Sequence, residues 1–461
     1  MNAAADPTRP ARPRGELFRY LEHTLTPDGV LRCAYEADGE RFEEIVDCGA
    51  DAGPDADWST PGAHAAARLV WLMAGVSYWK TTAAPRIVVE GGLSALERDF
   101  LADVYLHGLA EFAYVNGLDL SDVVVEGEPR EVAPVAAATT PGRPLIPFGG
   151  GIDSIVVVEE TRRRHPDAVL FVANTSDVLF APIEETAVVA GLPVLRARRR
   201  LDPLVLASRE RGYLNGHVPV TGVLSAIAVL VAVAHGRDSV VMSNEHSASE
   251  PTALRASGVL VNHQWSKGLE FESRFRELLA ATVTGVDYHS ALRPYSELWV
   301  ALRFADLAEY HHAFRSCNRA FHIDAGLRRD RWCGECDKCC FIDLILSPYL
   351  SREQLETIFD GREPLSRDDL EGRFRSLLGE VGRPKPLECV GDEGECRRAT
   401  LLAADRADRA DTPLLHRLAA YVADTGLAVP DTAVLLAPQG PHFLPDPPTE
   451  PATAVDPAGV A

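Results

Sequence analysis

A run of small residues with two polar side chains follows the apolar segment from Leu145 to Phe148. It consists of Gly149, Gly150, Gly151, Ile152, Asp153 and Ser154. Glycine accepts backbone conformations that other residues avoid, and the start of a helix offers free N–H groups, so a strand–turn–helix of this kind favours phosphate binding. Ser154 can donate a hydrogen bond to a phosphate, and Asp153 can cap the helix or bind Mg²⁺. The G-x-G-x-x-G spacing and the Walker lysine are both missing, and a tight turn without a ligand is the alternative interpretation.

A cluster of cysteines lies further along the chain. Of nine cysteines, an odd number, five fall between Cys317 and Cys340. Four have the spacing of a closed tetrahedral zinc site; these are Cys317, Cys333, Cys336 and Cys339. We predict a structural Zn²⁺, because four thiolates leave no open position, and we expect Cys340 to be a buried thiol. An iron–sulfur cluster and unliganded core cysteines are the alternatives. Cys389 and Cys396 are either structural residues, or one of them is a proton-transfer thiol.

Two polar segments lie between these motifs, from Ser243 to Pro251 and from Asn262 to Lys267. Glutamate, histidine and lysine near a nucleotide site are candidates for acid–base work and for Mg²⁺ binding. The candidates for catalysis are Asp153, Glu245, His246, His263 and Lys267. Arginine forks suit phosphate or carboxylate groups. The candidates for substrate binding are His217, Asn244, Trp265, Arg293 and Arg319. Four further arginines between Arg196 and Arg200 indicate a solvated basic face or a surface for an anionic substrate.

Short apolar strands alternate with helices in the part of the chain that carries the glycine-rich turn. The expected strands are 145–148, 168–173, 193–197 and 239–242, and the expected helices are 153–164, 182–190 and 221–234. This alternation is typical of an α/β fold with a doubly wound parallel sheet covered on both faces. Ligands of such sheets bind at the carboxyl ends of the strands. The loops after Phe148, Ala173, Ala197 and Met242 are therefore expected to carry the site.

The residues before the turn predict an α+β unit that shapes or covers the site. Asp38-Gly39 between two apolar runs indicates a hairpin, and Ser94 with Glu97 forms a capping box that begins a helix. A helix is expected over 65–76 and a strand over 86–90. The expected organisation is a disordered segment 1–14, an N-terminal domain 15–140, an ATP-binding domain 141–310, a mainly helical cysteine-rich region 311–435 and a disordered tail 436–461.

The chain is acidic, with 46 Lys and Arg against 67 Asp and Glu among 461 residues and a net charge of −21. This balance argues against broad binding to nucleic acid or to an anionic membrane, because both would repel the protein. An uninterrupted apolar stretch of membrane-spanning length and a secretory signal are both missing, so we expect a cytoplasmic protein. Its expected partner is a small-molecule substrate. The oligomeric state is not indicated.

The glycine-rich turn resembles the S-G-G-x-D-S signature of the PP-loop ATP pyrophosphatases. The matching residues are Gly150, Gly151, Ile152, Asp153 and Ser154. The resemblance implies that the turn grips the pyrophosphate of ATP while AMP is transferred to an oxygen acceptor. Gly149 stands where that family has a serine, so one hydroxyl contact is missing. The family places adenine against the loop after the second strand, which here contains Asn174, Thr175 and Ser176.

The stretch from about Gly149 to Phe359 resembles one branch of these enzymes, the UDP-N-acetylmuramoyl-L-alanyl-L-glutamate epimerase (MurL) family of cell-wall synthesis. The segments that carry the resemblance are 148–154, 216–221, 243–251, 261–267, 314–319, 332–341 and 388–391. The resemblance implies that ATP, with Mg²⁺, adenylates the α-carboxylate of the terminal L-Glu. The Cα proton of the acyl adenylate is then removed and returned on the opposite face, and water releases AMP.

Two other classes of protein fit the same motifs. One is a different PP-loop enzyme, such as a tRNA thiolase or a deazapurine nitrile synthase, although the net charge of −21 argues against an RNA substrate. The other is a non-catalytic nucleotide or zinc scaffold, for which Gly149 in place of serine is the best support.

Overall fold

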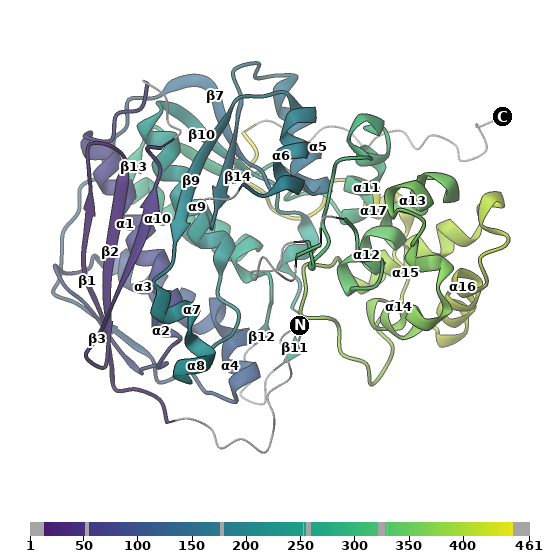
Figure 1. Ribbon diagram of the computed structural model, residues 1–461, viewed down its shortest axis with the longest axis horizontal. Helices are drawn as coiled ribbons and strands as arrows, with labels where there is room; N and C mark the ends of the chain where they lie inside the picture. The colour runs from purple at the N-terminus through teal and green to yellow at the C-terminus, as the bar shows by residue number, and fades with distance from the viewer. Residues whose placement is uncertain are drawn as a thin grey trace.

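The computed structural model describes residues 13–50, 55–175, 179–251, 253–254, 260–320, 328–329 and 331–445. Within these residues a ten-stranded sheet forms the left-hand part of the molecule, and a helical region extends from it to the right (Figure 1). The strands lie in the order β14 (Asp287–Ser290), β10 (Arg237–Met242), β7 (Thr140–Pro147), β8 (Val169–Asn174), β9 (Val194–Arg200), β3 (Glu40–Asp47), β2 (Val30–Ala37), β1 (Leu17–Leu25), β4 (Arg86–Val89) and β5 (Val124–Glu126).

Parallel pairing dominates this sheet. The five neighbouring strands from β14 to β9 are all parallel, as are β1, β4 and β5, whereas the joints from β9 through β3 and β2 to β1 are antiparallel. The predicted α/β class with a large, mainly parallel sheet is confirmed. The carboxyl ends of β7, β8, β10 and β14 lie at one edge, which brings the loops that follow them together.

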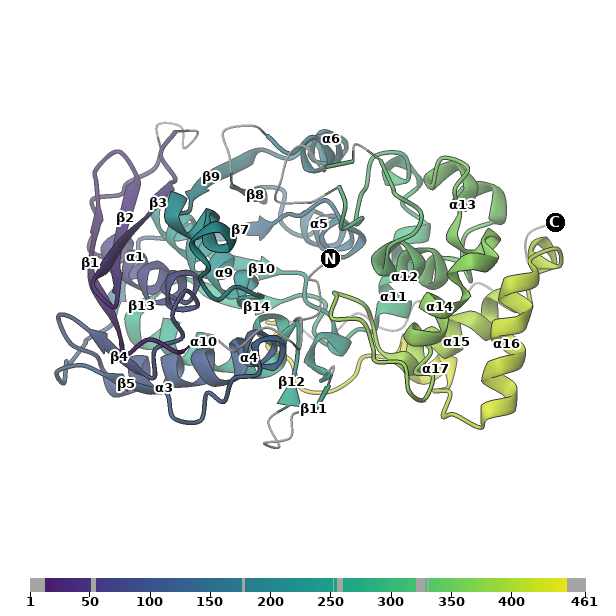
Figure 2. The same cartoon turned by 60° about the horizontal axis from the view of Figure 1, so that its bottom comes forward.

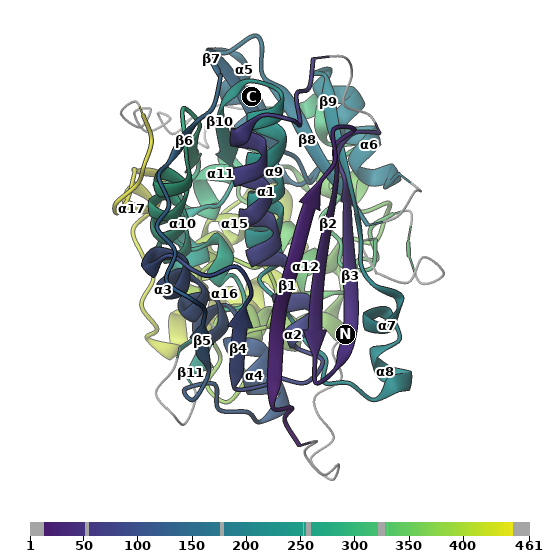
Figure 3. The same ribbon diagram turned by 90° about the vertical axis from the view of Figure 1, so that its left-hand side faces the viewer.

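The central strands are buried on both faces, as their apolar runs predict. Because side chains alternate along a strand, Leu145 of β7 and Phe171 of β8 point into one core, while Ile146 and Val172 point into the other. The first core lies under α1 (Pro61–Ala74) and α9 (Val220–Ala234), which pack against each other and lie side by side in Figures 2 and 3. The second core lies under α5 (Ile152–Arg162) and α11 (Glu297–Ala305) and continues into the helical region.

The helices before residue 300 cover and connect the strands. They are α1 (Pro61–Ala74), α2 (Val76–Trp79), α3 (Ala95–Asp103), α4 (Ala110–Asn116), α5 (Ile152–Arg162), α6 (Ala181–Ala190), α7 (Pro203–Leu206), α8 (Ser208–Arg211), α9 (Val220–Ala234) and α10 (Leu269–Thr282), followed by α11 (Glu297–Ala305). The helical region contains α12 (Asp337–Leu346), α13 (Arg352–Ile358), α14 (Glu371–Leu377), α15 (Glu393–Ala404), α16 (Pro413–Thr425) and α17 (Thr432–Leu436). Among the described helices, each is too short or too polar to cross a membrane.

Local sequence signals agree with these elements. Asp38 and Gly39 have φ values of 49° and 87° and connect β2 to β3 in a tight hairpin. The Ser94 hydroxyl accepts a hydrogen bond from the Glu97 backbone N–H, and the Glu97 carboxylate accepts one from the Ser94 backbone N–H, so the predicted capping box begins α3. The predicted hairpin and capping box are therefore confirmed.

One sheet contains strands from both sides of residue 140, where a domain boundary was expected. β3 pairs with β9 in antiparallel register, and a buried ion pair reinforces this joint, with Arg199 Nε 2.7 Å from Glu44 Oε1. Arg196 pairs with Glu184. The arginines from Arg196 to Arg200 therefore contribute to a structural joint, and the expected basic face is replaced by ion pairs at these two positions.

The two ends of the chain are ordered further than expected. Arg14 forms a 2.8 Å ion pair with Asp122, although residues 1–14 were expected to be disordered. Near the other end, Gln439 donates to the Pro294 carbonyl at 2.7 Å, and the ring of Phe443 lies 4.6 Å from the Arg276 guanidinium. Gln439 and Phe443, which lie in the expected disordered tail, therefore make defined contacts. Residues 1–12 and 446–461 lie outside the described part of the chain.

Candidate active site

The glycine-rich turn lies at the carboxyl end of β7 and leads directly into α5. Gly150 has a φ of 72°, a conformation that side chains disfavour, and Gly151 is the N-terminal cap of the helix. The Ser154 hydroxyl donates to the Gly151 carbonyl at 3.0 Å and closes the turn. A Cβ atom built on Gly149 would meet no described atom within 4 Å. The turn therefore presents the N-terminal end of an eleven-residue helix on an open side, as an anion site requires.

Three carboxylates from different elements gather beside this turn: Asp153 in α5, Glu245 after β10 and Glu297 in α11. Burial, reinforced by the charge of Glu245, raises the pKa of Asp153 to about 6. Burial raises the pKa of Glu297 well above its usual range, and the charges of Asp153 and Glu245 raise it further. No described residue offers a hydrogen bond to Asp153 Oδ1 or Glu297 Oε2. Crowded carboxylate oxygens of this kind are suitable ligands for a hard divalent cation.

Two lysines bring positive charge to the same carboxylates. For Lys267, burial alone would lower the pKa, but the charges of Cys389 and Glu245 raise it above its usual range. Lys338 acts electrostatically on both Asp153 and Glu297, and its Nζ donates to the Cys389 carbonyl. The site therefore combines several acidic groups with two ammonium groups.

His263 connects this region to α4. Its Nδ1 lies 2.5 Å from Glu111 Oε2, and its side chain also hydrogen-bonds to the Cys389 side chain. Burial alone would lower the pKa of His263, but these two hydrogen bonds raise it to about 10. The ring of His217 lies 4.3 Å away, centroid to centroid, and burial followed by the charge of His263 lowers the pKa of His217 to about 4. A protonated and a neutral imidazole therefore lie side by side.

Arg293 is a buried structural residue, which corrects the expectation that it binds the substrate. It is 1% exposed, and its Nε donates to Glu272 at 2.8 Å. Its other nitrogens donate to the backbone carbonyls of Glu245 and Lys267. Each of its three nitrogens donates to a group of the protein, and the buried side chain presents almost no surface to a ligand. It instead fixes the backbone that carries two of the predicted catalytic residues.

Trp265 also lies in the core rather than on a binding surface. It is 5% exposed, its ring packs 5.5 Å from that of Phe271, and its indole N–H donates to Glu270 at 3.0 Å. The expectation of an aromatic substrate contact is corrected accordingly. Arg319 is half-buried near the cysteines and pairs with Glu335.

The remaining predicted residues lie along the same edge of the sheet. Asn174, at the end of β8, is buried, and no described acceptor binds its Nδ2; Ser176 lies outside the described residues. The Asn244 backbone N–H donates to Ser290 Oγ at 2.7 Å. His246 is the exception, because a Cβ on Gly440 would lie 2.9 Å from its ring, which packs against the C-terminal segment. None of the described interactions of Asp153 and Glu297 involves His246.

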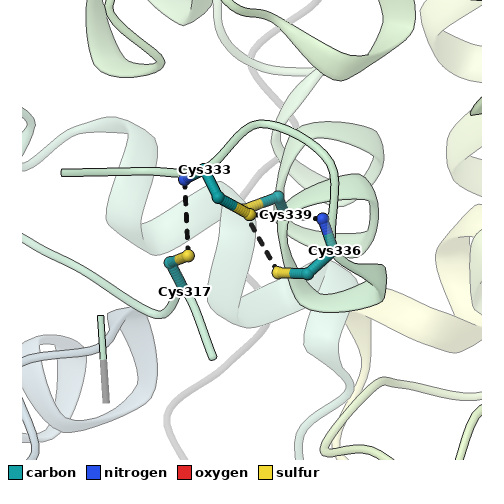
Figure 4. Close-up of side chains that lie close together, drawn as sticks. All are labelled: Cys317, Cys333, Cys336 and Cys339. Atoms are coloured by element: carbon teal, nitrogen blue, oxygen red, sulfur yellow. Dashed lines mark hydrogen bonds between the residues drawn. The ribbon is translucent and has the colours of Figure 1, made fainter. Parts of the chain in front are cut away.

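The four predicted zinc ligands converge in the structure (Figure 4). Their sulfur atoms all lie within 4.8 Å of one another, and the Cys336–Cys339 and Cys333–Cys339 sulfur distances are 3.4 and 3.6 Å. A tetrahedron with Zn–S bonds of about 2.3 Å has sulfur–sulfur edges of about 3.8 Å. The donor set therefore fits a four-coordinate Zn²⁺. Cys340 is fully buried, as expected.

The cysteine cluster is connected to the glycine-rich turn and to Cys389. The Arg315 backbone N–H donates to the Gly150 carbonyl at 3.3 Å, two residues before Cys317. Asn318 hydrogen-bonds to Glu388, and Lys338 lies between Cys336 and Cys339. A metal held by the four thiolates would therefore also fix the position of Lys338 beside the carboxylates.

Sequence reasoning missed Glu111, Glu297 and Lys338 as members of the site. Lys338 carried a usable signal, because a lysine between two metal ligands is held on a rigid loop. Glu111 carried none, since it sits in an ordinary helix and meets His263 only through the fold, 152 residues later.

The fold and site together define an α/β protein with a glycine-rich anion turn and a separate four-cysteine cluster. Family models match residues 10–291, described as the MurL N-terminal domain, and residues 313–432, described as the MurL C-terminal domain. The chain belongs to the MurL family.

Three similar proteins share the name UDP-N-acetyl-alpha-D-muramoyl-L-alanyl-L-glutamate epimerase. That of Salinispora tropica is 39% identical over 88% of both chains. That of a Micromonospora species is 38% identical over 89% of this chain and 91% of its own. That of Xanthomonas oryzae pv. oryzae is 39% identical over 93% of this chain and 95% of its own. The similarity therefore extends over nearly the full length of each relative.

Proposed function

We propose that this protein is an ATP-dependent epimerase that converts the terminal L-Glu of UDP-MurNAc-L-Ala-L-Glu to D-Glu in peptidoglycan synthesis. ATP would transfer AMP to the α-carboxylate and release pyrophosphate. The acyl adenylate makes the adjacent Cα–H far more acidic than a carboxylate does, so a base can remove the proton. Its return to the opposite face inverts the centre, and water then releases AMP. The names of the relatives support the substrate, and the site supports the chemistry.

The observation that carries this proposal is the position of Asp153. It follows a glycine turn that presents a helix N-terminus, and it keeps a buried oxygen without a described partner. An unsatisfied buried polar atom calls for a partner such as a water, an ion or a ligand, and beside a helix N-terminus a bound cation is the partner we propose. We propose that Asp153 and Glu245 bind Mg²⁺ while Gly149, Gly150, Gly151 and Ser154 hold the phosphates. The cation would offset the charge of the leaving pyrophosphate.

The adenine would lie against Asn174, whose side-chain amide has an unused donor in the described structure. The missing serine hydroxyl at Gly149 leaves the phosphate contacts to backbone N–H groups, which is compatible with the open side of the turn. This arrangement retains the PP-loop chemistry with one contact fewer.

The anionic UDP group needs a cationic surface other than Arg293. A cavity of about 840 Å³ is lined by Arg315, Arg331, His311 and His312 together with acidic residues such as Glu185. Arg315 connects this cavity to the turn through its backbone hydrogen bond to Gly150. We propose that Arg315 and Arg331 contact the diphosphate.

Zn²⁺ is proposed as a structural ion on Cys317, Cys333, Cys336 and Cys339. Four thiolates complete its coordination, so the ion would take no direct part in the reaction. Its contribution would be to stabilise the region that carries Lys338 and Arg315.

The test is to follow nucleotide products with ATP, Mg²⁺ and UDP-MurNAc-L-Ala-L-Glu. We expect AMP and pyrophosphate in the presence of the dipeptide substrate and neither in its absence. The same nucleotide bearing only L-Ala is the matched control and should give no AMP. Formation of ADP would contradict the proposal, and AMP formation independent of the dipeptide would indicate a different PP-loop reaction.

A further inference from the structure

Cys389 occupies a different environment from the other cysteines of its region. Its sulfur lies 3.2 Å from Lys267 Nζ and hydrogen-bonds to the His263 side chain, while its carbonyl accepts from Lys338. The side chain is half-buried. Cys396, seven residues later, is fully buried, and the charge of Lys385 that acts on it does not outweigh this burial.

The charges around Cys389 favour its thiolate. Burial alone would raise the pKa of the thiol, but the charge of Lys267 and the hydrogen bond and charge of His263 lower it to about 6. For Cys396, burial raises the pKa well above its usual range. A thiolate stabilised by neighbouring cations is typical of reactive cysteines, whereas a buried neutral thiol is inert.

The thiol also faces the place where the substrate carboxylate would be activated. Its charge acts on Asp153, and the Lys338 that holds its carbonyl acts on Glu297, whose buried Oε2 has no described partner. Glu297 is 3% exposed. The unsatisfied carboxylate and the thiol are therefore connected through the same two charged groups, Lys338 and Asp153, beside the turn.

Glu111 and His263 complete a chain of three groups that ends at the sulfur. The 2.5 Å contact between Glu111 and His263 orients the imidazole, and the imidazole reaches Cys389. A nucleophile or base, a histidine and an orienting carboxylate form the arrangement that activates side chains in many enzymes. Here the acyl adenylate makes a Cα proton the natural target.

We propose that the Cys389 thiolate removes the Cα proton of the adenylated glutamate, with Lys267 and His263 stabilising the thiolate and Glu111 acting as a positioning residue. This inference rests on the proposed function. The Cα–H bond breaks, an S–H bond forms, and the electron pair moves onto the acyl carbonyl oxygen as an enolate. A proton that originates from water returns to the opposite face, and the thiol loses its proton to solvent before the next turnover.

The test separates adenylation from proton transfer by running the reaction in D₂O with ATP, Mg²⁺ and the UDP-linked dipeptide. In Cys389→Ser we expect deuterium incorporation at the glutamate Cα to fall by about 10²–10⁴-fold, while dipeptide-dependent AMP formation stays within several-fold of wild type. Cys396→Ala is the matched control and should retain both. Deuterium incorporation within tenfold of wild type in Cys389→Ser would overturn the inference. If the wild-type protein itself makes no dipeptide-dependent AMP, the proposed function has failed instead.

A measurement on the unaltered protein guards against a folding defect in the variant. Iodoacetamide should alkylate Cys389 faster than Cys396, the substrate should protect it, and the alkylated protein should lose deuterium incorporation. Full deuterium exchange after complete alkylation of Cys389 would contradict the inference.

The donor atoms of Glu111, His217 and His263 also lie within 4.8 Å of one another, close enough to be ligands of one metal ion. A second metal ion per chain that is lost in His263→Gln would equally overturn it.

Discussion

Glu272 and Asp153 both bury carboxylate oxygen near the carboxyl edge of the sheet, yet their surroundings differ. Glu272 is 1% exposed, and its two oxygens accept from Arg293 Nε and from the Ser290 backbone N–H, each at 2.8 Å. Asp153 faces two other carboxylates, and no described donor reaches its Oδ1. The first acid is fully satisfied by the protein, whereas the second is not.

This difference separates the groups that build the site from the groups that act in it. Satisfied ion pairs such as Arg293–Glu272 hold loops in place, because a buried charge is tolerated when its hydrogen bonds are complete. A buried carboxylate that lacks partners destabilises the protein, and such groups concentrate where a ligand or a reaction requires them. Asp153 and Glu297 belong to this second kind.

The largest effect is expected from removing one of the four cysteines proposed to bind zinc. Their cluster is a third buried region to compare with Glu272 and Asp153. If the proposed zinc is bound, Cys336→Ser should lose it and lower AMP formation by more than about 10³-fold, because structural zinc sites supply folding free energy. Mass spectrometry measures the metal content of the variant, and the AMP assay measures its activity. Cys340→Ser in the neighbouring position is the control and should retain the metal; equal metal content in both variants would contradict the assignment.

Asp153→Ala tests the unsatisfied acid directly. We expect dipeptide-dependent AMP formation to fall by about 10²–10³-fold, the range seen when one group that stabilises developing charge is removed. The exposed Asp424→Ala should leave the rate unchanged. Unchanged turnover in Asp153→Ala would remove the glycine-rich turn from the chemistry.

Glu272→Gln tests the satisfied acid. Loss of its charge leaves Arg293 buried without its partner, so the free energy of unfolding should fall by about 3–5 kcal/mol. Denaturant unfolding monitored by circular dichroism measures the change. A loss below about 1 kcal/mol would show that Arg293 is not held by this pair.

Asp153→Asn should have the opposite effect on stability. The pKa of Asp153 is raised from 3.8 to about 6, so the folded state loses stability as the pH rises through this window. The asparagine side chain does not ionise, so the variant does not lose stability over this pH range. At pH 8, without nucleotide or Mg²⁺, we expect it to be more stable than wild type by roughly 1–3 kcal/mol. The gain should shrink below pH 6 and vanish below about pH 4; a variant less stable at pH 8 would contradict the account.

The smallest effect is expected at an exposed pair. Arg417 and Asp368 lie 2.6 Å apart with side-chain exposures of 42% and 74%. Arg417 also pairs with Glu371 at 3.0 Å. Since solvent screens such pairs, Arg417→Ala, which removes both, should change the free energy of unfolding by about 0–1 kcal/mol. A loss of unfolding free energy above about 1 kcal/mol, measured by denaturant unfolding, would contradict the contrast between exposed and buried ion pairs.

Features encoded in short segments were predictable from the sequence. The turn at Gly150, the capping box at Ser94 and the cysteine spacing each depend on neighbours within a few residues, and the structure contains all three. The contact between Lys267 and Cys389 was not predictable, because it joins residues 122 positions apart. Only the fold brings them together.

The same limit applies to the sheet and to the arginines. The pairing of β3 with β9 leaves no local sign in either strand, so the continuity of the sheet past residue 140 was missed. Arg293 looked like a ligand fork, because sequence cannot show that Glu272 and two backbone carbonyls already occupy its donors.

The most direct test of the central claim is the configuration of the product. UDP-MurNAc-L-Ala-L-Glu is incubated with the protein, ATP and Mg²⁺, hydrolysed, and its glutamate separated on a chiral column. The account predicts D-Glu that accumulates only when ATP is present. Exclusively L-Glu after AMP has been formed would contradict it.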